Sequence, residues 1–150
     1  MITLKPLKKD QFGCLRRAFE LRVEESNLTG RVSVDDLFRK LENGYDARCM
    51  GAYVDNTENP QHVLVMGHFP GFLTQGTFAS VILIYSLPEA RGDTGAVDVM
   101  ATTAENYARL NGCETLIGSS WVLDGARPID ALWKHYGFRE QERIYIKNLT

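Results

Sequence analysis

The residues best suited to bind a ligand lie in one glycine-containing segment in the second half of the chain. The segment Arg91-Gly92-Asp93-Thr94-Gly95-Ala96 lies between an apolar stretch and the expected start of a helix. The first turn of a helix leaves backbone N–H groups unpaired and carries a partial positive charge, and glycine lets a phosphate approach the backbone. The segment therefore favours an anion, and a diphosphate in particular. Its spacing differs from that of a P-loop or a GxGxxG turn, and a tight strand-to-helix connection is an equally good interpretation.

A few side chains elsewhere carry groups that can move a proton. His68 lies at the end of an expected strand, and its imidazole titrates near neutral pH. Tyr85 lies on the next expected strand and Tyr136 on a late helix, and both phenols can donate. Each has a structural alternative: a strand-end histidine commonly faces water, and the spacing of Tyr136 is typical of a core position.

The other histidines, His62 and His135, are interpreted as surface residues. Three histidines scattered along the chain, without carboxylates at regular spacing, predict no metal site.

Hydrophobic periodicity predicts alternating strands and helices, and therefore an α/β fold. Ser33 with Asp36 is typical of a helix start, and Gly44 is expected to end that helix. The expected order is a strand over 2–7, a helix with Phe12, Leu15, Phe19 and Val23 on one face, a helix from Ser33 to Gly44, a hairpin of 49–54 and 62–69, a strand over 78–87, a helix with Val97, Ala101, Ala104 and Ala108 on one face and Asn111-Gly112 at its end, a strand over 114–117, a helix from Pro128 to Gly137 and a strand over 143–149.

Composition limits the classes of protein to consider. The chain has 150 residues, 44% apolar and 24% charged, which predicts one globular domain over 1–150. A net charge of -2 gives no basic surface for nucleic acid or anionic membranes. Three widely spaced cysteines form no disulfide framework, and no signal peptide or membrane span is evident, so we expect a cytoplasmic protein.

The tail from Ser80 to Leu149 carries three patterns in a fixed order, and together they resemble the GNAT N-acetyltransferase superfamily. That family's cofactor motif reads Arg or Gln, two residues, Gly, one residue, then Gly or Ala, and the segment at 91–96 fits it except at Thr94. The other two patterns are Tyr107-Ala108-Arg109-Leu110-Asn111-Gly112-Cys113 and Ala131-Leu132-Trp133-Lys134-His135-Tyr136-Gly137-Phe138.

The resemblance implies a mostly antiparallel, twisted sheet flanked by about four helices. It splays between the strand that ends near Ser86 and the strand after Glu114, which makes a slot for the pantetheine arm of acetyl-CoA. In that picture the strand edge at Ile84, Tyr85 and Ser86 pairs with pantetheine. Arg91 and the amides of Gly92, Asp93, Thr94, Gly95 and Ala96 then hold the pyrophosphate.

Three positions depart from the family pattern. Thr94 replaces a glycine, which predicts weakened cofactor binding if that position needs a positive φ. Trp133 stands where many members have the tyrosine that protonates the leaving thiolate, and Ala126 stands where an asparagine is common. Tyr85 and Tyr136 are therefore the candidate acids, and His68 is the candidate base.

The resulting hypothesis is an acetyl-CoA-dependent N-acetyltransferase acting on a primary amine of a small molecule or protein. The acids of the first two helices, Glu24, Glu25, Asp35 and Asp36, are candidates to attract that amine, or form an ordinary solvated face. The alternative is a GNAT-fold protein without catalysis that binds CoA or another protein, and a third possibility is an unrelated α/β domain. Unpaired strand edges also make a homodimer plausible.

Overall fold

A computed structural model of the chain describes residues 2–25, 32–71, 76–118, 130–139 and 147. The chain forms two compact units, Met1–Ser119 and Ser120–Thr150.

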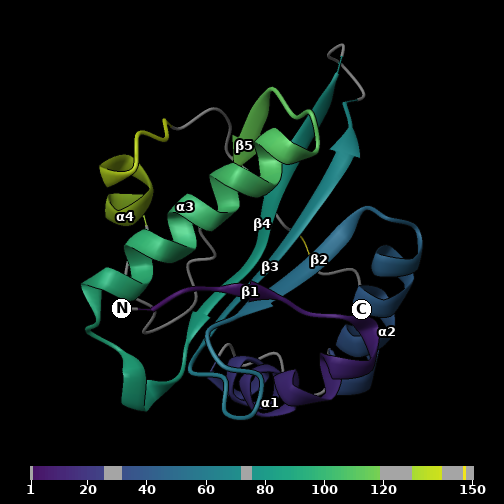
Figure 1. Ribbon diagram of the computed structural model, residues 1–150, viewed down its shortest axis with the longest axis vertical. Helices are drawn as coiled ribbons and strands as arrows, with labels where there is room; N and C mark the ends of the chain where they lie inside the picture. The colour runs from purple at the N-terminus through teal and green to yellow at the C-terminus, as the bar shows by residue number, and fades with distance from the viewer. Residues whose placement is uncertain (1, 26–31, 72–75, 119–129, 140–146, 148–150) are drawn as a thin grey trace. The chain divides into compact units, whose positions relative to one another are not determined.

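The first unit is built on a five-stranded sheet in the order β1-β2-β3-β4-β5 (Figure 1). The strands up to β4 pair antiparallel, whereas β5 runs parallel to β4, so the sheet is mixed as predicted. The predicted hairpin is confirmed, but the first strand is shorter than expected because only two of its residues pair with β2. The strands are β1 (Lys5–Pro6), β2 (Met50–Val54), β3 (His62–Pro70), β4 (Thr77–Ser86) and β5 (Thr115–Ile117).

Helices cover both faces of this sheet, and Figure 1 shows α3 on the side opposite α1 and α2. The predicted first helix is confirmed, although its start is a 3-10 helix, and its four expected core residues are all buried. Three of them, Phe12, Leu15 and Phe19, pack with α2 and with alternate residues of β2, β3 and β4 into the main core. The helices are η1 (Lys9–Leu15), α1 (Arg16–Glu25), α2 (Val34–Asp46), η2 (Pro88–Ala90) and α3 (Thr94–Leu110).

Helix α2 begins where the sequence predicted and ends later. The Ser33 hydroxyl accepts a hydrogen bond from the Asp36 amide at 3.0 Å, so the predicted cap is confirmed. The expectation that Gly44 ends the helix is wrong, because the helix continues to Asp46. Gly44 is there for packing: a Cβ on it would overlap the Met50 side chain.

Helix α2 ends in a Schellman motif with an arginine in the left-handed position. The Arg48 amide donates to the Tyr45 carbonyl at 3.0 Å, and the Cys49 amide donates to the Gly44 carbonyl at 2.9 Å. Arg48 has a φ of 60°. Glycine is the usual residue there, since a side chain in this conformation costs about 1–2 kcal/mol.

Helix α3 buries a face close to the predicted one. Ala104 and Ala108 are buried as expected, whereas Val97 and Ala101 are only partly covered. The buried face is rotated slightly around the helix axis from the predicted one, so that the large side chains of Met100 and Tyr107 point into the core. The buried residues of α3 are Ala96, Met100, Ala104, Tyr107 and Ala108. Gly112 follows the helix with a φ of 68°, in line with the predicted stop.

The described part of the second unit is helix α4 (Asp130–His135) and the turn that follows it. Gly137 has a φ of 84°, which confirms its predicted left-handed position. Trp133 is buried, and its ring lies 5.0 Å from that of Phe138. Two predicted features lie outside the described residues, namely the helix start at Pro128 and the position of Ala126. Of the predicted strand over 143–149, only residue 147 is described.

Candidate functional site

Strand β4 is paired on its β5 side only near its start, and the rest of that edge has no partner among the described residues. Strand β4 pairs with β5 only from Phe78 to Ser80, opposite Thr115–Ile117. From Val81 to Ser86, no described residue pairs with β4 on that side. The predicted splay concerns the continuation of β5, which lies outside the described residues. The described edge of β4 from Val81 to Ser86 offers backbone N–H and C=O groups to a ligand.

A β-bulge lies where this free edge begins. Val65 pairs with Leu83 and Met66 with Val81, so Ile82 has no opposite residue on β3. The Ile82 side chain is 45% exposed. A bulge bends its strand and leaves backbone groups outside the ladder, and the β-branched run around Ile82 contains no glycine or proline that would have revealed it.

The residues expected along the cofactor edge point to opposite faces of the sheet. Ser86 pairs with His62, and the Ser86 hydroxyl lies 2.7 Å from Nδ1 of that histidine on the α3 face. The interpretation of His62 as a surface residue is therefore wrong. It is 3% exposed, because its ring lies against Ser86 on this face of the sheet. Ile84 shares this face and is partly buried.

Tyr85 points to the other face, into the core formed with α1 and α2. It is 6% exposed, and its hydroxyl makes no hydrogen bond to the described part of the chain. Burial, with a further contribution from the Glu25 carboxylate, raises the pKa of Tyr85 to about 12. The Arg91 guanidinium lies 5.4 Å from the centre of its ring. The phenol is therefore firmly protonated at neutral pH.

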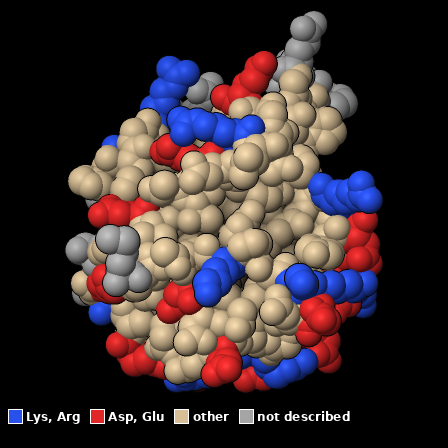
Figure 2. Space-filling model, viewed as in Figure 1, with Lys and Arg blue, Asp and Glu red and all other residues tan. Residues whose placement is uncertain are grey.

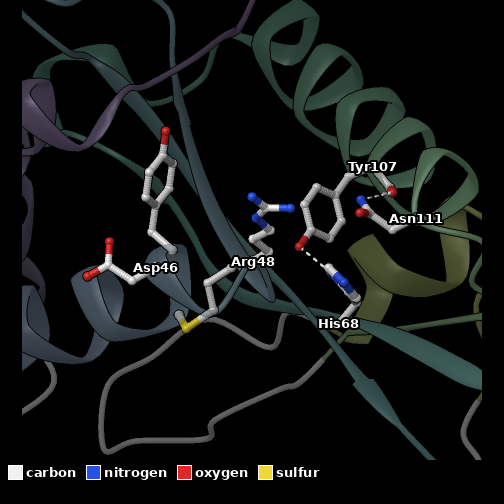
Figure 3. Close-up of a pocket in the computed structure, with 7 residues that line it drawn as sticks. Asp46, Arg48, His68, Tyr107 and Asn111 are labelled. Carbon is white, nitrogen blue, oxygen red and sulfur yellow. Dashed lines mark hydrogen bonds between the residues drawn. The ribbon is translucent and has the colours of Figure 1, made fainter.

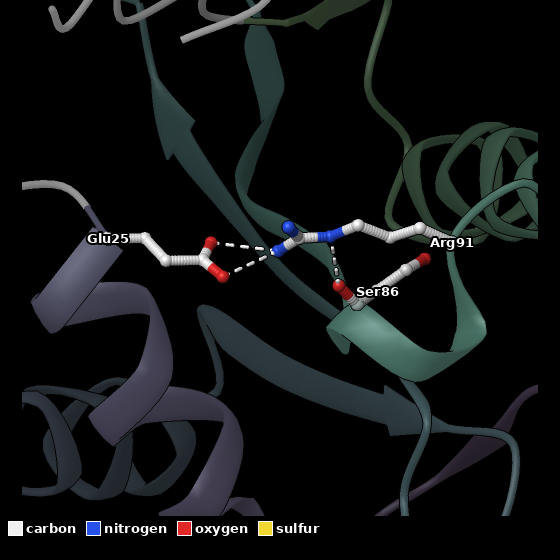
Figure 4. Close-up of polar contacts among 3 residues, drawn as sticks. All are labelled: Glu25, Ser86 and Arg91. Carbon is white, nitrogen blue, oxygen red and sulfur yellow. Dashed lines mark hydrogen bonds and ion pairs between the residues drawn. The ribbon is translucent and has the colours of Figure 1, made fainter. Parts of the chain in front are cut away.

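Arg91 is held by the end of α1 rather than extended into solvent. Its Nη2 donates to both carboxylate oxygens of Glu25, at 2.8 and 2.9 Å, and its Nε donates to the Ser86 carbonyl at 3.1 Å (Figure 4). The contact with Glu25 raises the pKa of Arg91. Both side chains remain substantially exposed, so this ion pair can open when a stronger anion arrives.

The candidate acids for amine attraction are mostly paired with arginines. Besides Glu25, Asp36 pairs with Arg39 and Asp35 with Arg16. Such exposed pairs are typical of a solvated helix face.

The start of α3 has the features that the sequence predicted for an anion site. Gly92 has a φ of 94° and a Cβ there would meet no atom within 4 Å, so the backbone is open to an incoming group. Asp93 is the cap residue, and its Oδ1 accepts from the Ala96 amide at 3.1 Å. Thr94 begins the helix with helical backbone, so the positive φ falls on Gly92 and not on Thr94.

Two amides of this turn are left for a ligand. Within the described ranges, the N–H groups of Thr94 and Gly95 make no hydrogen bond. The Ala96 amide, expected to hold pyrophosphate, is already occupied by Asp93. The same carboxylate places a negative charge at the site, which opposes an anion.

His68 lies in a different hollow, at the other end of α3. Its Nδ1 is 2.7 Å from the Tyr107 hydroxyl, which is also 3.4 Å from the Cys49 carbonyl. Tyr107 is 7% exposed, and burial raises its pKa. His68 is partly buried rather than facing water, and sequence reasoning missed Tyr107 as its partner because they are far apart in the chain.

The hollow itself has a volume of about 430 Å³, and polar side chains from α2, its C-terminal turn, β3 and α3 line it (Figure 3). Those labelled in the figure are Asp46, Arg48, His68, Tyr107 and Asn111.

The remaining candidate acid, Tyr136, belongs to the second unit, where it directly follows α4 and its ring lies 5.0 Å from that of His135. His135 is exposed, as interpreted from the sequence.

Charge is mixed on the face shown in Figure 2, where acidic and basic side chains alternate around a largely uncharged centre. Within the described ranges, no helix is long and apolar enough to cross a membrane, and no group of three or more metal-binding side chains comes together.

No protein-family model matches the chain, and a search of curated proteins returns no match. Solved structures match over nearly their whole length. An aminoglycoside N-acetyltransferase in complex with CoA is 14% identical with a TM-score of 0.75, covering 99% of this chain and 94% of its own. A predicted acetyltransferase with acetyl-CoA from Clostridium acetobutylicum is 15% identical with a TM-score of 0.74, covering 99% and 97%.

A transcriptional regulator from Bacillus halodurans is also 15% identical, with a TM-score of 0.77 over 99% of this chain and 100% of its own. At such identities the likeness is one of fold. The strand order, the parallel β4–β5 pair and these neighbours agree: the chain has the fold of the GNAT N-acetyltransferases.

Proposed function

We propose that this protein is an acetyl-CoA-dependent N-acetyltransferase that acetylates a primary amine of a small molecule or protein. The observation that carries the proposal is the edge of β4 from the bulge at Ile82 to Ser86, which no described residue pairs with on the β5 side. It leads to the amides of Thr94 and Gly95 at the start of α3, which have no described partner. An extended ligand with amide groups at one end and a diphosphate at the other fits that path, and CoA is such a ligand.

Different described residues bind different parts of the cofactor. Backbone groups of Ile84 to Ser86 pair with the amides of the pantetheine arm, as an added strand would. The amides of Thr94 and Gly95 donate to the diphosphate at the positive end of the helix dipole. Arg91 supplies a full positive charge beside them once it leaves Glu25.

The chemistry needs few protein groups once the thioester and amine are held together. The amine must be neutral to attack the thioester carbonyl, and orientation beside it provides much of the acceleration. When the C–S bond breaks, the thiolate takes up a proton. Tyr85 is our candidate donor because its buried hydroxyl is protonated and has no other described partner, and Tyr136 is the alternative. His68 is our candidate base through Nε2, since Nδ1 faces Tyr107.

A second candidate is a GNAT-fold protein that binds CoA or another protein without catalysis. Two observations favour it: a neighbour with a TM-score of 0.77 is a transcriptional regulator, and a tryptophan, which cannot act as an acid, occupies position 133.

The test is release of free CoA from acetyl-CoA in the presence of a panel of primary amines. The Gly95→Asp variant places a carboxylate among the free amides and should abolish release, while it remains folded because acids are favourable in a first helical turn. His135→Ala, an exposed change in the second unit, should retain full activity. Release that continues in Gly95→Asp, or no release by the unaltered protein with any amine, would contradict the proposal.

Tyr85→Phe distinguishes the candidate donors. Removing a buried hydroxyl that lacks a partner should not destabilise the fold. A fall in kcat of about 10²-fold or more with unchanged KM would assign the proton to Tyr85, whereas unchanged kcat would leave Tyr136 as the candidate.

A further inference from the structure

The hollow at the C-terminal end of α3 is separate from the proposed cofactor path. At about 1.5 Å per residue, helix α3 carries Tyr107 about 16 Å from Ala96 at its start. The described lining comes from α2, the turn after it, the start of β2, β3, and the end of α3 with its cap residue, and includes no residue of β4. Its volume of about 430 Å³ falls within the range of pockets that hold small organic molecules. We refer to it as the Arg48 pocket.

Arg48 is unexpected on two counts. It occupies the left-handed position after α2 where glycine is favoured, with a φ of 60°. Its guanidinium, which lines the pocket, forms no ion pair or hydrogen bond with the described residues. An arginine in an unfavourable backbone conformation, whose side chain makes no polar contact with the described residues, points to a role in binding, since strained residues persist at functional sites.

Other donors in the pocket face the same space as Arg48 (Figure 3). The Asn111 Nδ2 donates to the Tyr107 carbonyl at 2.8 Å and keeps its second hydrogen. The Arg48 guanidinium adds its own N–H donors. An acceptor with several lone pairs would satisfy these groups together.

The charge of the lining favours an anion. Asp46 is the one acidic residue among the described lining residues, and its carboxylate pairs with Lys9 at 2.8 Å. Arg48 is therefore left as the uncompensated charge in the pocket. Its planar fork matches a carboxylate in two parallel hydrogen bonds.

The rest of the lining favours an organic body on that anion. The rings of Tyr45 and Tyr107 and the thioether of Met50 provide apolar walls beside the donors. Inorganic phosphate would leave these apolar walls without a contact. An aromatic carboxylate would contact the donors with its carboxylate and the walls with its ring.

We infer that the Arg48 pocket is a binding site for a small organic carboxylate with an aromatic or aliphatic body, distinct from the cofactor path. The inference does not depend on acetyl transfer, and its test uses neither acetyl-CoA nor an amine.

Benzoate and its neutral analogue benzamide are the probes, titrated into the unaltered protein and followed by NMR. Benzoate should shift resonances of Arg48, His68, Tyr107 and Asn111, and benzamide should bind at least tenfold more weakly. Arg48→Gly should weaken benzoate to the level of benzamide and raise Tm, because glycine suits the left-handed turn. Arg109→Gln, an exposed arginine on α3 outside the lining, should leave benzoate binding unchanged.

Equal binding of benzoate by Arg48→Gly would overturn the assignment, as would benzoate shifts confined to other residues. Inorganic phosphate that binds in this pocket as tightly as benzoate would overturn the choice of a carboxylate. A lower Tm for Arg48→Gly would show that Arg48 supports the fold instead.

Discussion

Glu25→Gln should tighten the binding of CoA, because it releases the arginine that the diphosphate needs. In the structure Nη2 of Arg91 donates to both oxygens of the Glu25 carboxylate, at 2.8 and 2.9 Å. To contact a diphosphate at the start of α3, the guanidinium must leave this partner. The free energy of the pair is therefore subtracted from the cofactor's affinity in the unaltered protein.

The expected gain follows from the exposure of the pair. The side chains are 48% and 36% exposed, and ion pairs of this kind contribute about 0.2–1 kcal/mol. Removing the charge on Glu25 should thus strengthen CoA binding by a factor of about 1.4 to 5, since 1.4 kcal/mol corresponds to tenfold. Stability should fall by no more than a similar amount.

Calorimetric titration with CoA at low salt measures this change. Arg17→Gln is the matched control, because the Arg17–Glu89 pair at 2.7 Å also joins α1 to the segment after β4 and is similarly exposed. That variant should bind CoA as the unaltered protein does. The double variant Glu25→Gln with Arg91→Gln should lose the gain, because the two changes act through one contact.

The reasoning is refuted if Glu25→Gln binds CoA no more tightly than the unaltered protein while Arg91→Gln binds it more weakly. Arg91 would then assist the cofactor without leaving Glu25.

Three further changes test the site and the fold. Asp93→Asn keeps the helix cap but removes the negative charge beside the free amides, so CoA affinity measured by calorimetry should rise, while urea unfolding should show a loss of about 0.3–1 kcal/mol from the helix dipole; weaker CoA binding would contradict this. Gly44→Ala should destabilise the protein by about 1–3 kcal/mol in the same unfolding assay because its Cβ overlaps Met50, whereas Gly13→Ala, which meets no atom within 4 Å, should not destabilise it. Between about pH 10 and 12 the folded state keeps the proton of Tyr85 that the unfolded chain has lost, so stability should fall as pH rises through this window, and less steeply in Tyr85→Phe; equal slopes for both proteins would refute the assigned pKa.

Local signals in the sequence predicted the parts of the fold that depend on local physics. Ser33 caps its helix, Gly137 takes a left-handed conformation, and the hairpin pairs as expected. Each is decided by residues within a few positions of one another.

The errors arose where distant residues meet. Glycine is a residue type that often ends helices, which led to the prediction at Gly44. Close packing against Met50 is the reason for a glycine there, and Arg48 takes the left-handed position at the end of the helix instead. His62 follows a turn, which suggested a surface position, but its partner Ser86 lies on another strand.

In the candidate site too, features formed by neighbouring residues were predictable and those formed by distant residues were not. The helix start at Thr94, on which the proposed anion site rests, was predictable because the cap and the glycines are adjacent in the chain. The Glu25–Arg91 pair and the capping of Ala96 by Asp93, which decide how open that site is, depend on side-chain geometry that spacing does not reveal. The bulge at Ile82 had no sequence signal at all.

The most direct test of the central claim is a calorimetric titration of the protein with acetyl-CoA, with thermal unfolding followed in parallel. We predict saturable binding that Gly95→Asp abolishes, and a rise in Tm of several degrees when the ligand is at about 100 times its Kd, which corresponds to about 2.7 kcal/mol. No binding at millimolar acetyl-CoA, or equal binding by Gly95→Asp, would contradict the assignment of the β4 edge and the start of α3 as a cofactor site.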